Sequence, residues 1–248
     1  MIQITFHGHS FFQIIKDSSY KDQDDHRDNN HNHYTILVDP FITDNPKCDV
    51  MIDDVLTRDS DVLVITHGHR DHIWDSIAIL KAHPSCIVVA PYGIVQWLQS
   101  QGITNPMQGL GIWWTRSNEQ AYFKLVNAIH DGSILNTWLS TQPSWIIITI
   151  NDKHIYHAGD TALHTDMQLI PSWWPIDVAL LPIGDHYTMG VHDAIIATSW
   201  IKPTIVVPIH YNTFPTIKAD DMEFARQVML HKYATPKVLK SWQSIVLE

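Results

Sequence analysis

Cysteine is scarce in this sequence: Cys48 and Cys86 are the only two in 248 residues, and they do not form a CxxC pair. Cys86 opens the apolar run 86–90, so we expect a buried free thiol rather than a disulfide. This usage argues against a scaffold built on a disulfide framework.

Long hydrophobic runs are also missing. No apolar stretch approaches the roughly 20 residues needed to span a bilayer. Residues 1–6 show no basic segment leading into an apolar one, as a signal peptide would. We therefore expect a cytoplasmic protein without membrane insertion.

Basic residues are few: 16 Lys and Arg stand against 26 Asp and Glu, which gives a formal net charge of −10. Such a chain lacks the basic surface that binds nucleic-acid backbone, so we expect no nucleic-acid partner. A small-molecule substrate remains compatible with this charge, including a small phosphodiester whose charge is met by metal ions.

The remaining composition is that of a compact globular chain, with 45% hydrophobic and 17% charged residues. A chain of this length can form one large core. No linker and no close repeat interrupts it, so we predict a single domain over residues 1–248.

Histidine, by contrast, is abundant, with 17 residues. The densest group is residues 66–72, Thr-His-Gly-His-Arg-Asp-His. It follows the apolar, β-branched run 61–65, which predicts a buried strand, and precedes the amphipathic pattern of a helix over 73–82. Three imidazoles and a carboxylate are therefore expected in one strand-to-helix turn.

This spacing favours a metal site. In an extended loop, residues two apart point the same way, so His67 and His69 can bind one ion together. Asp71 and His72 lie further round the turn, where they can face a second position. Imidazole and carboxylate suit zinc, manganese, iron or nickel. The alternative, a polar loop with Asp71 capping the helix, accounts for Asp71 alone.

Three further candidates stand at the ends of apolar strands. His130 follows residues 125–129, Asp160 follows 155–159, and His210 follows 205–209. Strand ends on one rim of a sheet converge on a common crevice, where ligands bind. A lone histidine at such a place is more often a hydrogen-bonded structural residue, but three such residues beside the 66–72 turn favour metal ligation.

The rest of the chain reads as alternating strands and helices, typical of two packed sheets with helices outside. We predict residues 105–119 as a connecting loop and residues 17–33, which are acidic, rich in histidine and almost free of apolar side chains, as a mobile hairpin loop. The predicted strands are 2–6, 11–16, 34–38, 61–65, 86–90, 122–129, 145–150, 154–156, 177–182, 204–209 and 237–246. The predicted helices are 73–82, 94–101, 192–202 and 220–232.

Taken together, residues 67–72, His130, Gly159-Asp160-Thr161 and His210 resemble the ligand series of the metallo-β-lactamase superfamily. More closely, the chain resembles the bacterial UPF-type metal-dependent hydrolases of that superfamily, relatives of the L-ascorbate-6-phosphate lactonases and of N-acylphosphatidylethanolamine phospholipase D. Supporting stretches extend from Gly8-His9-Ser10 to residues 210–215, nearly the whole chain.

The resemblance implies an α/β (α+β) fold, a four-layer αββα sandwich with two divalent metal ions between the sheet edges. Zinc is the foremost candidate, with Mn²⁺, Ni²⁺ or Fe²⁺ as alternatives. Asp39 would be a carboxylate behind the ligands that steadies the 66–72 turn. The implied ligands are His67, His69 and His130 for the first ion, Asp71, His72 and His210 for the second, and Asp160 between them.

Two ions about 4 Å apart can hold a bridging hydroxide, because they lower the pKa of water from 15.7 towards ~7. We therefore expect a hydrolase of a small-molecule ester, either a phosphodiester or a lactone or acyl ester, with Asp71 in the catalytic group. His9 or His186 is expected to donate a hydrogen bond or proton to the substrate, with a structural hydrogen bond as the alternative for each. A non-catalytic metal-binding or metal-sensing protein is the alternative function.

Two tryptophan pairs, Trp113-Trp114 and Trp173-Trp174, lie in turn-rich segments. They can line a pocket or a subunit contact, which makes a homo-oligomer plausible. Packing of these indoles back onto the core is an equally good interpretation.

Overall fold

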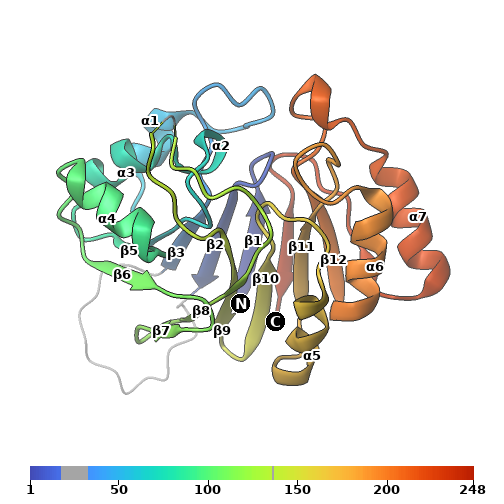
Figure 1. Ribbon diagram of the computed structural model, residues 1–248. Coiled ribbons are helices and arrows are strands. Elements are labelled where there is room, and N and C mark those ends of the chain that lie inside the picture. The colour runs from blue at the N-terminus through green and yellow to red at the C-terminus, as the bar shows by residue number, and fades with distance from the viewer. Residues whose placement is uncertain (18–32, 136) are drawn as a thin grey trace, which may run out of the picture.

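Two mixed β-sheets face each other in this protein, as seen in a computed structural model that describes residues 1–17, 33–135 and 137–248 (Figure 1). The predicted mobile loop 17–33 lies outside the described residues, apart from its two end residues. Seven described strands form each sheet. The amino- and carboxyl-terminal strands lie together in the first sheet, where β1 and β14 pair antiparallel.

The first sheet has the strand order β14-β1-β2-β3-β4-β5-β6. Its strands from β14 to β3 are antiparallel, and those from β3 to β6 are parallel. The bounds are β1 Ile2–Phe6, β2 Phe12–Asp17, β3 His33–Val38, β4 Val62–Val64, β5 Ile87–Pro91, β6 Met107–Leu110 and β14 Ser244–Leu247.

The second sheet has the order β13-β12-β11-β10-β9-β8-β7 and the same division. Its strands from β7 to β10 are antiparallel, and those from β10 to β13 are parallel. The bounds are β7 Thr115–Ser117, β8 Tyr122–Asn127, β9 Ser144–Ile150, β10 Lys153–His157, β11 Val178–Pro182, β12 Ile205–Ile209 and β13 Thr235–Pro236.

Helices cover the outer face of each sheet, which completes four layers (Figure 1). The first sheet carries α1 Ile52–Thr57, α2 Arg70–Ile73, α3 Ser76–Ala82 and α4 Tyr92–Ser100. The second carries α5 Ile170–Trp173, α6 Val191–Ile201 and α7 Asp221–His231, with 3₁₀ turns η1 Thr165–Leu169 and η2 Pro215–Ile217. The predicted αββα sandwich is confirmed.

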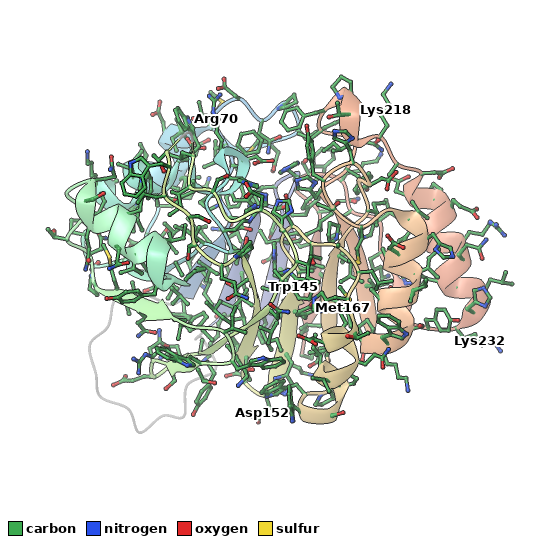
Figure 2. The ribbon with its side chains drawn as sticks, in the orientation of Figure 1. Arg70, Trp145, Asp152, Met167, Lys218 and Lys232 are labelled. Carbon is green, nitrogen blue, oxygen red and sulfur yellow. The ribbon has the colours of Figure 1, made fainter. Side chains whose placement is uncertain are left out.

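Strand β9 shows why the layers hold together. Ile146 and Ile148 point into the core between the two sheets, whereas Trp145 and Ile147 point into the layer under α5 and α6. Figure 2 labels Trp145 and, from η1, Met167 of this outer layer. Alternate residues of a strand face opposite sides, so a strand that is apolar throughout must be covered on both faces.

One predicted loop and one predicted strand, both at sheet edges, differ from the structure. Residues 105–119 are not all loop, because β6 and β7 lie there and pair with β5 and β8. Their sequences show no alternation of apolar and polar side chains, since β6 contains Gly109 and all three residues of β7 are exposed. The predicted strand 237–246 is also too long, since only Ser244–Leu247 pairs with β1. Pairing partners, rather than local pattern, decide these edges.

The predicted helix 73–82 is interrupted between α2 and α3. The Asp75 carboxylate, almost fully buried, accepts hydrogen bonds from the backbone N–H groups of Ile42 and Thr43 and from the Thr43 hydroxyl, at 2.6 to 2.9 Å. This contact fixes the loop that follows Asp39 to the start of α3. Among the described residues, no helix is long and apolar enough to cross a membrane.

The predicted tryptophan pairs meet on the second sheet. The rings of Trp113 and Trp173 lie 4.8 Å apart, and the Lys124 ammonium lies 5.1 Å from the Trp174 ring. Trp113 and Trp174 pack partly buried against the outer core of this sheet. Packing of Trp113 and Trp174 onto the core is therefore observed, whereas Trp114 and Trp173 are exposed and a role of the pairs in oligomer formation stays a prediction.

We expect Asp75→Ala to lower the free energy of unfolding by about 2–4 kcal/mol, because two backbone N–H groups lose their acceptor. Urea denaturation measures this loss. Glu119→Ala, which removes an exposed carboxylate between β7 and β8, is the control and should change stability by less than about 0.5 kcal/mol. Equal stability of the two variants would contradict the structural role of Asp75.

Candidate metal centre

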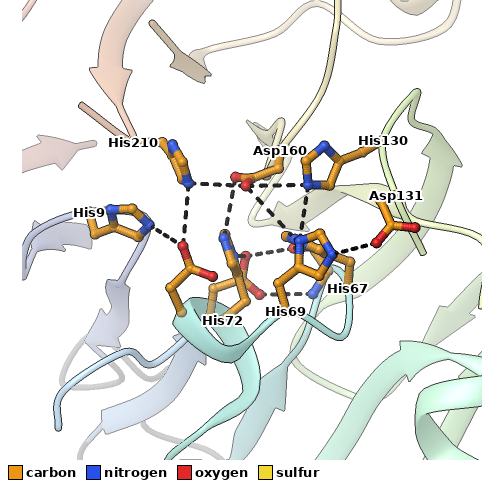
Figure 3. Close-up of polar contacts among 12 residues, drawn as sticks. His9, His67, His69, His72, His130, Asp131, Asp160 and His210 are labelled. Carbon is orange, nitrogen blue, oxygen red and sulfur yellow. Dashed lines mark hydrogen bonds and ion pairs between the residues drawn. The ribbon is translucent and has the colours of Figure 1, made fainter. Parts of the chain in front are cut away.

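Polar side chains from both sheets meet at one rim of the sandwich, where the strands end (Figure 3). His9 follows β1 and residues 66–72 follow β4 in the first sheet; His130, Asp160 and His210 follow β8, β10 and β12 in the second. The structure thus brings together all seven predicted ligands, and His9 joins them.

The first cluster contains three imidazoles around one position. The Nδ1 atom of His69 lies 3.1 Å from the Nε2 atom of His67 and 3.1 Å from that of His130. The Oδ2 atom of Asp160 lies 3.8 and 3.6 Å from the same two Nε2 atoms. Tetrahedral ligands about 2.0–2.1 Å from zinc lie about 3.3 Å from one another, so these spacings fit one ion.

The second cluster contains Asp71, His72 and His210. Asp160 faces it with both oxygens: Oδ1 lies 3.3 Å from His72 Nε2, and Oδ2 lies 3.0 Å from His210 Nε2. Asp71 Oδ2 lies 3.6 Å from His210 Nε2. The Asp160 carboxylate therefore stands between the two clusters, as expected of a bridging group.

His9 belongs to the second cluster, a place that the sequence did not suggest for it. Its Nε2 atom lies 3.0 Å from Asp71 Oδ2, and its Nδ1 atom lies 3.0 Å from the Thr213 hydroxyl. Burial, followed by the neighbouring His210, lowers the pKa of His9 to about 4. The ring is therefore neutral at physiological pH, which is the form that binds metals.

The clusters also leave buried polar atoms without hydrogen-bond partners among the described residues: His72 Nε2, Asp160 Oδ1 and both ring nitrogens of His210. Such unpaired atoms are rare in protein interiors and are costly. Each except His210 Nδ1 faces another member of the two clusters at 3.0 to 3.6 Å. Divalent cations would satisfy His72 Nε2, Asp160 Oδ1 and His210 Nε2, so the residues fit a metal centre.

Charge within the site points the same way. Burial and the neighbouring His72 hold the pKa of His67 well below its usual value. For His72, burial is outweighed by the carboxylates of Asp160 and Asp39, which hold its pKa well above the usual range. For Asp160, burial is outweighed by His210 and His72, which hold its pKa well below normal. The carboxylates thus require positive charge, which a cation supplies.

Asp39 orients two of the ligands from behind, in the position expected of it. Its carboxylate accepts hydrogen bonds from Thr66 N at 2.8 Å, from the Thr66 hydroxyl at 2.6 Å and from His72 Nδ1 at 2.8 Å. The Thr66 hydroxyl lies 3.1 Å from His67 Nδ1. Because these contacts occupy the Nδ1 atoms, the Nε2 atoms of His67 and His72 remain free for a metal.

Asp131 plays the corresponding part for His69, and sequence reasoning missed it. Its Oδ2 atom lies 3.1 Å from His69 Nε2, beside the Ser133 hydroxyl at 3.2 Å from the same nitrogen. Ser133 and His69 lower the pKa of Asp131 to about 2. The only signal in the sequence was adjacency to His130, because the return of this loop to His69 is a tertiary feature.

Close packing explains why the residue between His67 and His69 is a glycine, Gly68. Leu135 N donates to the Gly68 carbonyl at 2.7 Å, and a Cβ atom on Gly68 would lie 2.7 Å from the Ile134 Cα atom. No larger residue fits there without movement of the backbone, so glycine lets the loop after His130 close onto the 66–72 turn.

His186 lies outside both clusters. Its side chain is exposed in the loop between β11 and α6, and the centroid of its ring lies 4.4 Å from that of the Tyr187 ring. Its predicted role as a proton or hydrogen-bond donor stays a prediction.

Comparison with known proteins agrees with this site. Residues 34–211 match the sequence profile of the β-lactamase superfamily domain. Over 253 aligned residues the chain is 38% identical to a UPF0173 metal-dependent hydrolase of Bacillus mycoides, and the match covers 100% of both chains.

Solved structures show the same fold. Igni18, a metallo hydrolase from the archaeon Ignicoccus hospitalis, has a TM-score of 0.84 at 32% identity, with 100% of this chain and 98% of that chain covered. An isothiocyanate hydrolase from Delia radicum gut bacteria has a TM-score of 0.73 at 17% identity, with 99% and 98% covered. The latter likeness concerns the fold alone.

These matches place the chain in the metallo-β-lactamase superfamily, whose fold it shares. Within that superfamily the chain belongs to the UPF0173 family of metal-dependent hydrolases, so the resemblance inferred from its motifs is confirmed.

We expect Asp39→Ala to weaken metal binding about 10–100-fold at both positions, because His67 and His72 lose their common partner. Asp131→Ala should weaken binding at the first position alone. Titration of Zn²⁺ against a competing chelator measures both effects. Wild-type affinities in the two variants would contradict the orienting roles of these carboxylates.

Proposed function

We propose that this hydrolase cleaves a small phosphodiester with two divalent metal ions bound at the two clusters. The observation that carries the proposal is the Asp160 carboxylate, whose Oδ2 atom lies 3.6 Å from His130 Nε2 and 3.0 Å from His210 Nε2. A shared carboxylate between adjacent metal positions is the arrangement of sites that clamp both oxygens of an in-line displacement.

Charge favours an anionic substrate over a neutral one. The ligand set offers two carboxylates, Asp71 and Asp160, together with imidazoles. Two divalent cations would exceed the charge of these two carboxylates, and the further carboxylates Asp39 and Asp131 lie behind the ligand histidines rather than among the ligands, so the metal positions themselves would attract an anion within a chain of net charge −10. A phosphodiester anion complements that local charge, and repulsion by the remaining surface suits a small substrate better than a long polyanion.

Divalent ions held by the two clusters would supply a water molecule activated at neutral pH and would stabilise negative charge on the leaving oxygen. Among the proposed ligands, Asp71 and His69 are accessible acid–base groups, because their side chains are 27% and 25% exposed, against 3% for Asp160. Asp71 therefore stands where it would accept a hydrogen bond from an attacking water molecule. His186 would act as a donor only on a substrate that reaches its exposed loop.

Zinc is the metal that we propose for the first position, because three nitrogens and one carboxylate oxygen are a common zinc set. The second position also accepts Mn²⁺, Ni²⁺ or Fe²⁺. Hydrolysis of a lactone or acyl ester is the second candidate reaction, since the same water chemistry would serve it. A non-catalytic metal sensor is disfavoured by the family, whose members are named hydrolases.

We expect metal-reconstituted protein to hydrolyse a generic aryl phosphodiester, and His69→Ala to lower turnover by at least about 100-fold, because it removes a ligand of the first position. His192→Ala, at an exposed histidine outside both clusters, is the control and should keep wild-type turnover. Release of the aryl alcohol is followed by absorbance.

Undiminished turnover in His69→Ala would contradict the proposed site. Absence of phosphodiesterase activity together with cleavage of an aryl lactone or acyl ester by the same preparation would favour the second candidate. Failure of the wild-type protein to bind divalent metal ions would contradict both candidate reactions.

A further inference from the structure

We propose that His157 is a positioning residue that sets the spacing of the two metal clusters by joining the turn that presents His9 to the turn that presents Asp160. The inference rests on the metal centre proposed above. It concerns a residue that is not a ligand of either cluster and that ends β10 in the second sheet.

Both ring nitrogens of His157 have defined partners. Nε2 lies 2.9 Å from the Ser10 carbonyl oxygen, and Nδ1 accepts a hydrogen bond from Gly159 N at 3.1 Å. A carbonyl only accepts and a backbone N–H only donates, so the ring must be neutral with its proton on Nε2. The side chain is fully buried, and burial lowers the pKa of His157, which favours this neutral form.

The first partner belongs to the opposite sheet. Ser10 lies in the turn between β1 and β2 directly after His9, and its carbonyl is held by the second sheet through His157. The same turn is held at a second point, where His210 N donates to the His9 carbonyl at 2.9 Å. Two hydrogen bonds from the second sheet thus fix the turn that presents His9 to the second cluster.

The second partner controls Asp160. Gly159 adopts φ +47°, and a Cβ atom on it would lie 2.9 Å from the Thr66 hydroxyl oxygen. Glycine is therefore required where this turn meets the residue that links Asp39 to His67. The bond from Gly159 N to His157 holds the turn, and the next residue, Asp160, is thereby directed between the clusters.

The two bonds act on different parts of the centre. The Ser10 bond fixes the side that carries His9, which belongs to the second cluster alone. The Gly159 bond fixes Asp160, which lies between both clusters. Changing either bond moves ligands without removing one, so the two nitrogens of His157 should have separable effects on metal binding.

Two amide variants separate these effects. In His157→Asn the amide lies near the former Nδ1 position, so it can still accept from Gly159 N but cannot reach Ser10. In His157→Gln the amide lies near the former Nε2 position, so it can still donate to Ser10 but not accept from Gly159. His154→Gln is the control, because His154 lies on the same strand and contacts Thr149 at 2.8 Å, outside the centre.

The test is titration of each protein with Co²⁺, followed by the visible absorption spectrum and by turnover. Wild type and His154→Gln should bind about two Co²⁺ per chain with the same spectrum. We expect His157→Asn to keep the affinity of the first equivalent and to lose about tenfold at the second, and His157→Gln to lose about tenfold at both. Turnover, as kcat, should fall in both variants while KM changes less than about twofold.

Wild-type Co²⁺ affinities and spectra in both His157 variants would overturn the inference while leaving the metal centre intact. An equal loss of affinity for both Co²⁺ equivalents in the two variants, including a loss through unfolding, would overturn the separable roles of the two ring nitrogens and leave His157 a structural residue of the core. Failure of the wild-type protein itself to bind two Co²⁺ would overturn the proposed centre and this inference with it.

Discussion

The Asp160 carboxylate, buried where the two sheets meet, is the group on which the rest of the site depends. Imidazoles of His67, His72, His130 and His210 surround it at 3.0 to 3.8 Å, and its side chain is only 3% exposed. A buried anion is costly unless positive charge faces it. Two cations beside this carboxylate would meet that requirement, and they would also satisfy the unpaired His72 and His210 Nε2 atoms around it.

The sandwich fold builds this environment from two halves. The first sheet supplies His9 and the 66–72 turn, and the second supplies His130, Asp160 and His210. The site is complete only when the apolar core between the sheets has formed, because that core fixes how the two sets of strand ends meet. Asp39 and Asp131 then set ring orientation within each half. The geometry of the site therefore depends on the packing of the two sheets.

Much of this was readable in the sequence, for identifiable reasons. His67 and His69 stand two apart after an apolar strand, and three other candidate ligands each end a strand, so local pattern pointed to these five residues. The place of His9 in the second cluster and the contact of Asp131 with His69 depend on how distant loops return, which no local pattern encodes. The break between α2 and α3 is similar, because Asp75 bonds to a loop more than 30 residues earlier in the chain. Edge strands β6 and β7 were missed because backbone pairing, rather than side-chain alternation, defines them.

The central claim is that two metal ions share Asp160, and electron paramagnetic resonance of Mn²⁺-loaded protein tests it most directly. If both clusters bind metal on either side of this carboxylate, about two Mn²⁺ bind per chain and their spins couple, which gives a spectrum unlike that of isolated Mn²⁺. Asp160→Asn should lose this coupling. One bound ion, or two ions with the spectrum of isolated Mn²⁺ in the wild-type protein, would contradict the account.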